Sequence, residues 1–546
     1  MSAEPIVILG GGFAGVYAAR HLERHLHAGH DIILFSQENH LVFTPLLGNV
    51  VGSSINPMHV VWPVRQMLRR ATCRTAAVVA VDLPAREVHY RTPANQLARQ
   101  PFGHLVLACG NVVKLDIIPG MAAHGWPLKT MGDALVLRNH LIGLLEKAQV
   151  EPDPDRRRQL LSVVVVGGGF SGVEVAGEIA DLLKESARFY SDVPIGDVRV
   201  TLLHRGDRIL PELPPTLGEF ARLKMQARGI DIRLKSEAAA VTEWGVRLKA
   251  GDEVPAATVV CTIGTTANPL LTAAGLPMEK GRVKAGSDFR VQGFENVWAL
   301  GDCAAVPNAH DGQLCPPTAQ FATRQARALA RNLAAATAGK PAEPFRFKPL
   351  GAFASIGNRR AVGQVFGLRF SGLPAWFLWR GIYLSKMPTL ARKVQIAFDW
   401  GWQIFFPRDI VQLNLWQTER LNHAHYETGQ YVFHRGDPGD KFYLIEHGKA
   451  GVYLADAGPP VAVLGEGDHF GEGALLSGSP RSAHVRAEEP LDVLVLSQQS
   501  FAQLTHHCRV LRTVVERVWR QRERHDRQIT GGPPAAAGVA ANAPGR

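Results

Sequence analysis

A short apolar run, a glycine-rich turn and the start of a helix follow one another twice along the chain. The apolar runs lie at residues 5–9 and 162–166, and each has the length of a buried parallel strand. The turns at residues 10–15 and 167–172 both have the spacing Gly-X-Gly-X-X-Gly. In such a turn the glycines allow a tight bend, close approach to a pyrophosphate and close packing of the helix on the strand. The two units together predict an α/β protein with two Rossmann-like dinucleotide-binding folds.

The residues that end the second strand of each unit bear on which dinucleotide is bound. An acid at this place usually accepts a hydrogen bond from the ribose. In the first unit the place is taken by Ser36, and Ser36 or the neighbouring Glu38 can still bind a ribose hydroxyl. In the second unit the strand ends in His204 and Arg205. A base here accommodates a 2′-phosphate, so NADPH stays open beside NADH, as does the interpretation that these are solvated surface charges.

Further apolar runs end in small residues and extend the two sheets. They end at Gly110, at Gly264 and at the pair Gly301 and Asp302. Asp302 then lies at the carboxyl edge of a parallel sheet, where open α/β folds bind ligands and where it can accept hydrogen bonds from a polyol chain. An ordinary turn at a strand end is the alternative. A long helix is predicted over residues 318–336, and the partial positive charge of its N-terminus suits a reduced flavin.

Length and composition narrow the class of protein. The chain has 546 residues, 46% hydrophobic and 20% charged, which predicts a globular protein of about three or four domains. The net charge of +11 suits acidic lipids, nucleotides or nucleic acid, but no basic run has the character of a nucleic-acid motif. The six cysteines are far apart and form no CxxC pair, so we expect no metal site, no disulfide framework and a reducing compartment. We expect no signal peptide, and no spanning helix because no stretch reaches about 18 consecutive apolar residues.

Residues 370–416 combine aromatic rings with cations. Five of the ten tryptophans lie here with phenylalanines and basic residues: Trp376, Trp379, Trp400, Trp402, Trp416, Phe377, Phe398, Phe405, Phe406, Arg380, Lys386, Arg392, Lys393 and Arg408. Such a mixture suits the bilayer interface, where bases meet anionic headgroups. A core patch or a subunit interface is the alternative. In this position we favour peripheral attachment to a membrane.

From residue 415 the pattern changes to short strands with glycine turns, which predicts a small β-roll. Residues 467–476 and 480–483 resemble the phosphate-binding cassette of cyclic-nucleotide-binding domains. A cyclic phosphate needs backbone N–H groups and one guanidinium, which Arg481 would supply, while Glu472 would accept the ribose 2′-hydroxyl. We expect a site for cAMP or cGMP, and the alternative is a domain of this fold that binds nothing. A helix over residues 501–527 would cap the site.

The elements of residues 5–410 resemble, in their order, the type II NADH:quinone oxidoreductases, which are flavoproteins with two dinucleotide folds. The resemblance rests on residues 10–15, 39–40, 43–47, 167–178, 301–302 and 316–320. It implies FAD on the first fold, with Asp302 on its ribityl-phosphate side. It implies NAD(P)H on the second fold, with Glu174 near the nicotinamide. A quinone would meet the flavin near Ala319, Gln320 and Gln325.

Three positions depart from the pattern of that family. Ser36 and His204 stand where an acid usually binds a ribose. Arg324 stands at the last position of the motif Ala-Gln-X-Ala-X-Gln on the quinone helix. Arg324 mildly favours an alternative enzyme, a reductase that passes electrons to a protein or another non-quinone acceptor. A ligand-regulated binding protein, with the flavin fold only as a scaffold, is the non-enzymatic alternative.

These interpretations define domains and contacts. The expected domains are an FAD-binding domain at residues 1–125 and 285–345, an NAD(P)H-binding domain at 126–284, a membrane-associating region at 346–412, a cyclic-nucleotide-binding domain at 413–530 and a disordered tail at 531–546. The expected FAD contacts are Gly10, Gly12, Phe13, Ala14, Gly15, Ser36, Gly110, Asp302, Ala319 and Gln320. The expected NAD(P)H contacts are Gly167, Gly169, Phe170, Gly172, Glu174, His204, Arg205 and Gly264. The expected quinone contacts are Gln320, Arg324 and Gln325, with Glu174 and Gln320 as catalytic residues. The expected cyclic-nucleotide contacts are Gly471, Glu472, Ala474, Arg481, Ser482 and Ala483.

The function expected from all of this is electron transfer from NADH or NADPH, through FAD, to a quinone, without proton pumping. The enzyme would be cytoplasmic and peripheral on the inner face of the cell membrane. The adjacent C-terminal domain suggests regulation by a cyclic nucleotide. A homodimer stays open, and no nucleic acid partner is expected.

Overall fold

The computed structural model describes residues 4–26, 29–92, 96–349, 351–412, 422–437, 439–455, 458–477, 480–497, 501 and 517–518. The chain divides into two compact units, Met1–Leu413 and Asn414–Arg546. The predicted capping helix over residues 501–527, apart from residues 501 and 517–518, and the tail at residues 531–546 lie outside the described residues.

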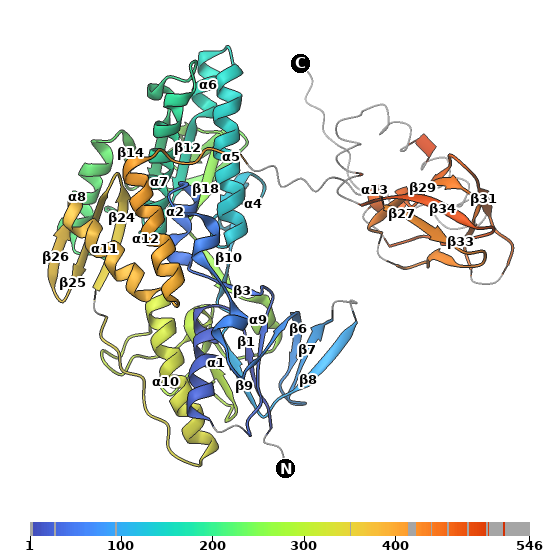
Figure 1. Cartoon of the computed structure of the whole chain (residues 1–546), viewed down its shortest axis with the longest axis horizontal. Coiled ribbons are helices and arrows are strands. Elements are labelled where there is room, and N and C mark those ends of the chain that lie inside the picture. Colours follow the sequence, from blue (N-terminus) through green and yellow to red (C-terminus); the bar gives the residue numbers. More distant parts are fainter. Residues whose placement is uncertain are drawn as a thin grey trace. The chain divides into compact units, whose positions relative to one another are not determined.

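The first Rossmann-like fold contains a five-stranded parallel sheet. Its strand order is β22 (Val297–Ala299), β9 (His104–Leu107), β1 (Ile6–Leu9), β2 (Ile32–Ser36) and β5 (Thr72–Thr75). β1 is wholly buried, as expected for a parallel strand that is covered on both faces. The helices α1 (Phe13–His25) and α10 (Ala319–Thr337) pack against each other beside this sheet (Figure 1). β22 and α10 come from far along the chain, so this fold is built from two separate segments.

The second Rossmann-like fold contains another five-stranded parallel sheet. Its order is β11 (Gly125–Pro127), β18 (Thr258–Cys261), β12 (Ser162–Val166), β13 (Arg199–Leu203) and β14 (Ile230–Arg233). Its helices include α5 (Met131–Val150), α6 (Pro154–Leu160), α7 (Phe170–Ser186) and α8 (Pro215–Gln226). The capping box of Thr130 and Asp133 begins α5. Both predicted dinucleotide folds are confirmed.

Short elements connect and cover the two sheets. The remaining helices are α2 (Leu47–Val51), α3 (Val64–Met67), α4 (Met121–His124) and α9 (Pro269–Ala273). The remaining strands are β3 (His40–Val42), β4 (Val61–Pro63), β6 (Ala77–Asp82), β7 (Glu87–Arg91), β8 (Leu97–Pro101), β10 (Asn111–Val113), β15 (Ala238–Thr242), β16 (Gly245–Leu248), β17 (Glu253–Pro255), β19 (Thr265–Ala267), β20 (Met278–Glu279), β21 (Arg282–Lys284) and β23 (Ala304–Ala305).

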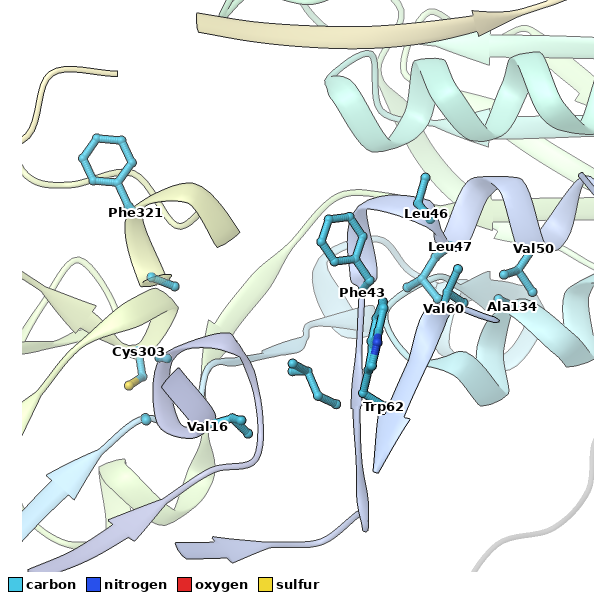
Figure 2. Close-up of a cluster of buried hydrophobic side chains, with 14 of the residues drawn as sticks. Val16, Phe43, Leu46, Leu47, Val50, Val60, Trp62, Ala134, Cys303 and Phe321 are labelled. Carbon is cyan, nitrogen blue, oxygen red and sulfur yellow. The ribbon is translucent and has the colours of Figure 1, made fainter. Parts of the chain in front are cut away.

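One hydrophobic core joins the two folds. Figure 2 shows Phe43 beside Trp62, and their ring centroids are 6.1 Å apart. In the same view Leu47 and Val50 of α2 lie toward Ala134 of α5. Because α2 packs against both α5 and α7, the segment after β3 fastens the first fold to the second.

Residues 351–405 form a small sheet followed by two helices. The sheet contains β24 (Gly351–Gly357), β25 (Arg360–Val365) and β26 (Leu368–Ser371), and the helices are α11 (Gly372–Lys386) and α12 (Leu390–Phe405). β24 packs against α7. Within the part of the chain that the structure describes, no helix is long and apolar enough to cross a membrane.

The second unit contains two four-stranded antiparallel sheets, which confirms the predicted β-roll. One sheet has the order β27 (Asn422–Tyr426), β34 (Leu491–Ser497), β29 (Lys441–His447) and β32 (His469–Phe470). The other has the order β28 (Tyr431–Phe433), β33 (His484–Ala487), β30 (Ala450–Tyr453) and β31 (Ala462–Leu464). The short helix α13 (Glu472–Ser477) follows β32. Alternating apolar residues such as Ile445, Leu491 and Val493 form the core.

Candidate functional site

The first glycine turn combines positions that the fold needs with one that it leaves open. Gly10 has φ +118°, and a Cβ there would collide with the carbonyl of Ala108. A Cβ on Gly15 would collide with the carbonyl of Gly10. A Cβ on Gly12, by contrast, would meet no atom within 4 Å. Gly12 is also the N-cap of α1 and offers no side-chain cap, so the first N–H groups of the helix are open to an anion.

The residues expected around this turn gather there. Ser36 lies against Gly11, and its hydroxyl donates to the carbonyl of Glu38 at 2.6 Å. The side chain of Ala14, on α1, lies against Gly301, which follows the end of β22. Gly110 has φ +64° and open space on its Cβ side. The hydrogen bond within the loop accounts for the hydroxyl proton of Ser36, and leaves its oxygen as an acceptor.

Asp302 lies at the carboxyl end of β22, as expected. Its side chain is 25% exposed, and its Oδ2 is 4.0 Å from Nζ of Lys129. Burial raises the pKa of Asp302, and the cations Lys129 and Arg282 oppose this. Lys129 also donates to Oδ1 of Asn111 at 2.5 Å. The pairing with Lys129 thus favours the ionised carboxylate, the form that accepts hydrogen bonds from hydroxyl groups.

The three residues expected to contact a quinone all lie on α10 but differ in their surroundings. Gln320 lies partly exposed in the first turn of this helix, which Thr318 caps by accepting from the N–H of Phe321 at 3.4 Å. Gln325 is 1% exposed, and its Oε1 accepts from the N–H of Gly301 at 2.8 Å. Arg324 is exposed, with its guanidinium 5.4 Å from the ring centroid of Phe347. Gln325 therefore holds the Gly301–Cys303 turn in place, and the structure does not bring it together with Gln320.

The second glycine turn repeats the geometry of the first. Gly167 has φ +124°, and Gly172 approaches its carbonyl too closely for a Cβ. Gly169 is the N-cap of α7, again with no side-chain cap. A Cβ on Gly169 would lie 3.5 Å from Oε1 of Glu212. No sequence motif pointed to Glu212, because it lies in the loop after β13 and outside the glycine motif.

The groups at the end of β13 are arranged around the same turn. The Nδ1 atom of His204 accepts from the N–H of Gly168 at 3.2 Å. Burial and the nearby Arg205 lower the pKa of His204. The ring is therefore neutral at neutral pH, and Arg205, which is exposed, is the cation at this position. Gly264 has φ +76° and lies against Ile117.

Glu174 lies in the second turn of α7 and faces β24. Its Oε1 accepts from the N–H of Ser355 at 3.1 Å. Burial, helped by the nearby Glu178 and opposed by the hydrogen bond from Ser355, raises the pKa of Glu174 to about 8. The carboxyl group is therefore mostly protonated at neutral pH. Burial and the charge of Glu174 also raise the pKa of Tyr383 on α11.

A row of aromatic rings connects the first turn to the surroundings of Glu174. The centroid distances are 5.5 Å from Phe13 to Phe43, 5.9 Å from Phe43 to Tyr383 and 4.8 Å from Tyr383 to Trp379. Residues of three distant segments form this row, so no sequence motif indicated it. From the sequence, Trp379 was expected only as one of the aromatic residues at a membrane interface.

In the second unit, Gly471, Glu472 and Arg481 come together. Arg481 is 4% exposed, and its guanidinium donates to the carbonyls of Gly471 at 2.8 Å and Lys441 at 2.7 Å. The guanidinium also lies 4.3 Å from the ring centroid of Phe433. Burial lowers the pKa of Arg481, and Glu472 is among the groups that raise it. Burying charged groups such as Glu472 and Arg481 costs free energy of folding unless they are paired and hydrogen-bonded.

The other cassette residues lie around this pair. Ala474 is partly buried on α13, Ser482 is exposed and Ala483 is partly buried before β33. The six predicted residues thus lie beside or within α13 and just before β33, and their role in binding a nucleotide stays a prediction.

Comparisons with known proteins agree with this geometry. Residues 4–326 match the family model for pyridine nucleotide-disulphide oxidoreductases, residues 350–409 the NDH2 C-terminal domain and residues 423–508 the cyclic nucleotide-binding domain. The chain is 31% identical over 404 residues to a demethylphylloquinone reductase of Synechocystis, covering 72% of this chain and 95% of that protein. It is also 31% identical over 414 residues to the type II NADH:quinone oxidoreductase NdhA of Mycobacterium tuberculosis, covering 72% and 86%.

A solved structure shows the same fold at lower identity. NDH2 from Plasmodium falciparum in complex with NADH superimposes with a TM-score of 0.70 at 18% identity, over 75% of this chain and 99% of that one. The chain is therefore a member of the type II NADH:quinone oxidoreductase family, within the pyridine nucleotide-disulphide oxidoreductases, and carries an additional cyclic nucleotide-binding domain.

Proposed function

We propose that the protein oxidises NADH and passes the electrons through FAD to a quinone at a membrane surface, without pumping protons. The observation that carries this proposal is the pair of uncapped helix N-termini over glycine turns, each beside a carboxyl group. α1 begins on the sheet that carries Asp302, and α7 itself carries Glu174. The relatives are named as NADH or quinone oxidoreductases, which supports the same reaction.

The residues of the first fold suit FAD. The open space at Gly12 and the free N–H groups of α1 would hold the pyrophosphate, and Asp302 would accept hydrogen bonds from the ribityl hydroxyls. The N-terminus of α10, at Ala319 and Gln320, would stabilise negative charge on the reduced ring. When bound, the cofactor supplies the capacity to accept a hydride and to release two electrons to an acceptor.

Glu174 is proposed to hold and release a proton during this cycle. Its pKa of about 8 lies near the operating range of a general acid or base. The N–H of Ser355 fixes one of its carboxyl oxygens. Burial of the carboxyl group favours the uncharged acid, and the contact with Trp379 opposes this.

NADH is proposed as the donor in preference to NADPH. The neutral ring of His204 is occupied by the N–H of Gly168 and adds no positive charge for a 2′-phosphate. Glu212 near Gly169 adds a negative charge instead. Arg205 favours NADPH, so we expect a preference for NADH rather than exclusion of NADPH.

Gln320 is proposed as the quinone contact nearest to the flavin, with Arg324 further along the same helix. The guanidinium of Arg324 lies over the ring of Phe347, and this cation–π contact stabilises its charge. The exposed apolar residues of α12 are proposed to attach this side of the first unit to the membrane; they are Leu390, Val394, Phe398, Trp402 and Phe405. In the second unit, Glu472 and Arg481 are proposed to bind the ribose and phosphate of a cyclic nucleotide, cAMP or cGMP.

The proposal is tested by anaerobic stopped-flow spectroscopy of the purified full-length protein. We expect a yellow protein whose flavin absorbance is bleached by NADH faster than by NADPH and is restored by menaquinone or ubiquinone analogues. Glu174→Gln should slow bleaching or restoration. A colourless protein, or one that NADH bleaches but no quinone restores, would contradict the proposed reaction. Unchanged rates of both half-reactions in Glu174→Gln would contradict only the role of Glu174.

A further inference from the structure

The last described residues of the first unit, 408–412, are held inside that unit. The side chain of Arg408 is 11% exposed and lies among three carboxylates of α7. Its Nη1 donates to Glu178 at 2.6 Å, its Nη2 to Asp181 at 3.3 Å and its Nε to Glu185 at 3.1 Å. Burial works against the charge of Arg408, but the carboxylates outweigh it and raise its pKa. Arg408 thus fastens the end of the described part of the first unit to α7.

Arg138 of α5 holds the same segment through its backbone. Its Nη1 donates to the carbonyl of Val411 at 3.0 Å, and its Nη2 to the carbonyl of Asp409 at 3.3 Å. Its Nε donates to the hydroxyl of Ser53 at 2.7 Å. The chain between residues 408 and 411 is therefore tied to both α5 and the segment that follows α2.

The face of α7 that receives Arg408 also carries Glu174. Glu174, Glu178 and Asp181 are four and three residues apart, which places them on one side of the helix. Asp181 further accepts from the N–H of Asn358 at 2.7 Å, just after β24, the strand that holds Glu174 through Ser355. If Arg408 left, the buried Glu178 would lose its cationic partner, which is strongly unfavourable without rearrangement, whereas Asp181 would keep its ion pair with Arg228. The segment therefore cannot move while α7 stays unchanged.

We propose that residues 408–411 form the coupling element through which a cyclic nucleotide bound to the second unit changes electron transfer in the first. Binding would change how firmly this segment is held, and the ion pairs of Arg408 would transmit the change to α7 and Glu174. This inference rests on the proposed function, because it needs both a ligand in the second unit and a reaction beside Glu174. The regulated element is thus α7, and the ligand class is a 3′,5′-cyclic nucleotide.

The test measures NADH oxidation by the full-length protein with ubiquinone-1, with and without saturating cAMP or cGMP, and with 5′-AMP as a control. Binding of each nucleotide is measured separately by calorimetry. In the wild type we expect turnover to change by about fivefold or more, the lower end of typical coupling between sites. Turnover without any nucleotide tests the proposed reaction by itself, so loss of the response alone would overturn only the coupling.

Arg138→Gln is the informative variant, because Arg138 contacts the segment but no residue assigned to the reaction. We expect it to keep its basal turnover and cyclic-nucleotide binding while losing the response. Arg157→Gln is the matched control. Arg157 is also partly buried in an ion pair, at 3.0 Å from Asp197, but lies on α6 away from the segment. This control should respond as the wild type does.

Hydrogen exchange of the wild type gives a second measurement that does not depend on the folding of a variant. We expect the nucleotide to change exchange at residues 408–411 and in the second half of α7. Unchanged exchange with nucleotide bound, a full response in Arg138→Gln, or absence of any cyclic-nucleotide binding would each overturn the proposal.

Discussion

Single residues in this protein differ in what they are needed for, even within one motif. Gly10 and Gly12 belong to the same turn, yet only Gly10 has a positive φ and a backbone carbonyl against its Cβ position. Gly12 has an extended conformation that any residue can adopt. Gly10 is therefore needed for the fold, and Gly12 leaves room for the ligand.

Two alanine substitutions should separate these requirements. Gly10→Ala should destabilise the protein by about 1–3 kcal/mol or more, because strain at positive φ is added to a steric collision. Gly12→Ala should leave the stability of the apoprotein unchanged and reduce its FAD content. Chemical denaturation of the apoprotein and flavin absorbance of the purified protein measure the two effects. Equal stability losses in both variants would contradict this division.

Glu174 should make the stability of the apoprotein depend on pH. Its pKa is raised from 4.5 to about 8 by burial, so the folded state holds a proton that the unfolded state releases in this range. Stability from this group is therefore full below 4.5 and is lost as the pH rises to about 8. Glu174→Gln should remove this part of the pH dependence. Denaturation midpoints of both proteins across the range measure it, and parallel curves would contradict the raised pKa.

At the scale of elements, α12 shows why a stripe of aromatic residues can be assigned to a surface. Leu390, Val394, Phe398, Trp402 and Phe405 recur every three or four residues and are 50–81% exposed. Ile396 and Trp400, on the other side, are at most 2% exposed and pack inward. The sequence indicated the mixture of rings and cations. The structure places Trp376, Trp379 and Trp400 in the core and Trp402 on the outer face. Trp416 lies outside the described residues.

The exposed stripe should bind lipid. Phe398→Ser combined with Trp402→Ser should weaken binding to anionic vesicles by about a hundredfold or more, since each ring would lose about 1.5–3 kcal/mol of burial. Trp244→Ser is the control, because Trp244 is 63% exposed but lies before β16 in the second fold. Vesicle sedimentation measures the effect. Equal binding by all three proteins would mean that α12 does not face the membrane.

At the scale of the whole molecule, buried charges rather than motifs join the parts. Arg408 bonds Glu178, Asp181 and Glu185 and also donates to the carbonyl of Gly52 at 2.5 Å. Asn49 of α2 donates to the other oxygen of Glu178 at 2.8 Å. The first fold, the second fold and residues 408–412 of the first unit thus meet in one cluster.

Removal of Arg408 should cost about 3–5 kcal/mol of stability, as for other buried ion pairs that lose one partner. Arg408→Met together with Glu178→Gln should cost less than the sum of the single changes, because one orphaned carboxylate is then removed. A double-mutant cycle by chemical denaturation measures this difference. Additive costs would show that the two side chains do not interact.

The glycine turns, the strands before them and the cyclic-nucleotide cassette could be located from local patterns of residues. These depend on short-range backbone geometry, so their residue spacing specifies them. That Gln325 turns inward to Gly301, that His204 accepts from Gly168 and that Arg408 meets α7 became evident only in the folded chain. Folding also brings Glu212 to the second turn and Tyr383 to Phe43. These contacts join residues far apart in the chain, and packing and burial of charge, which no local pattern encodes, select among them.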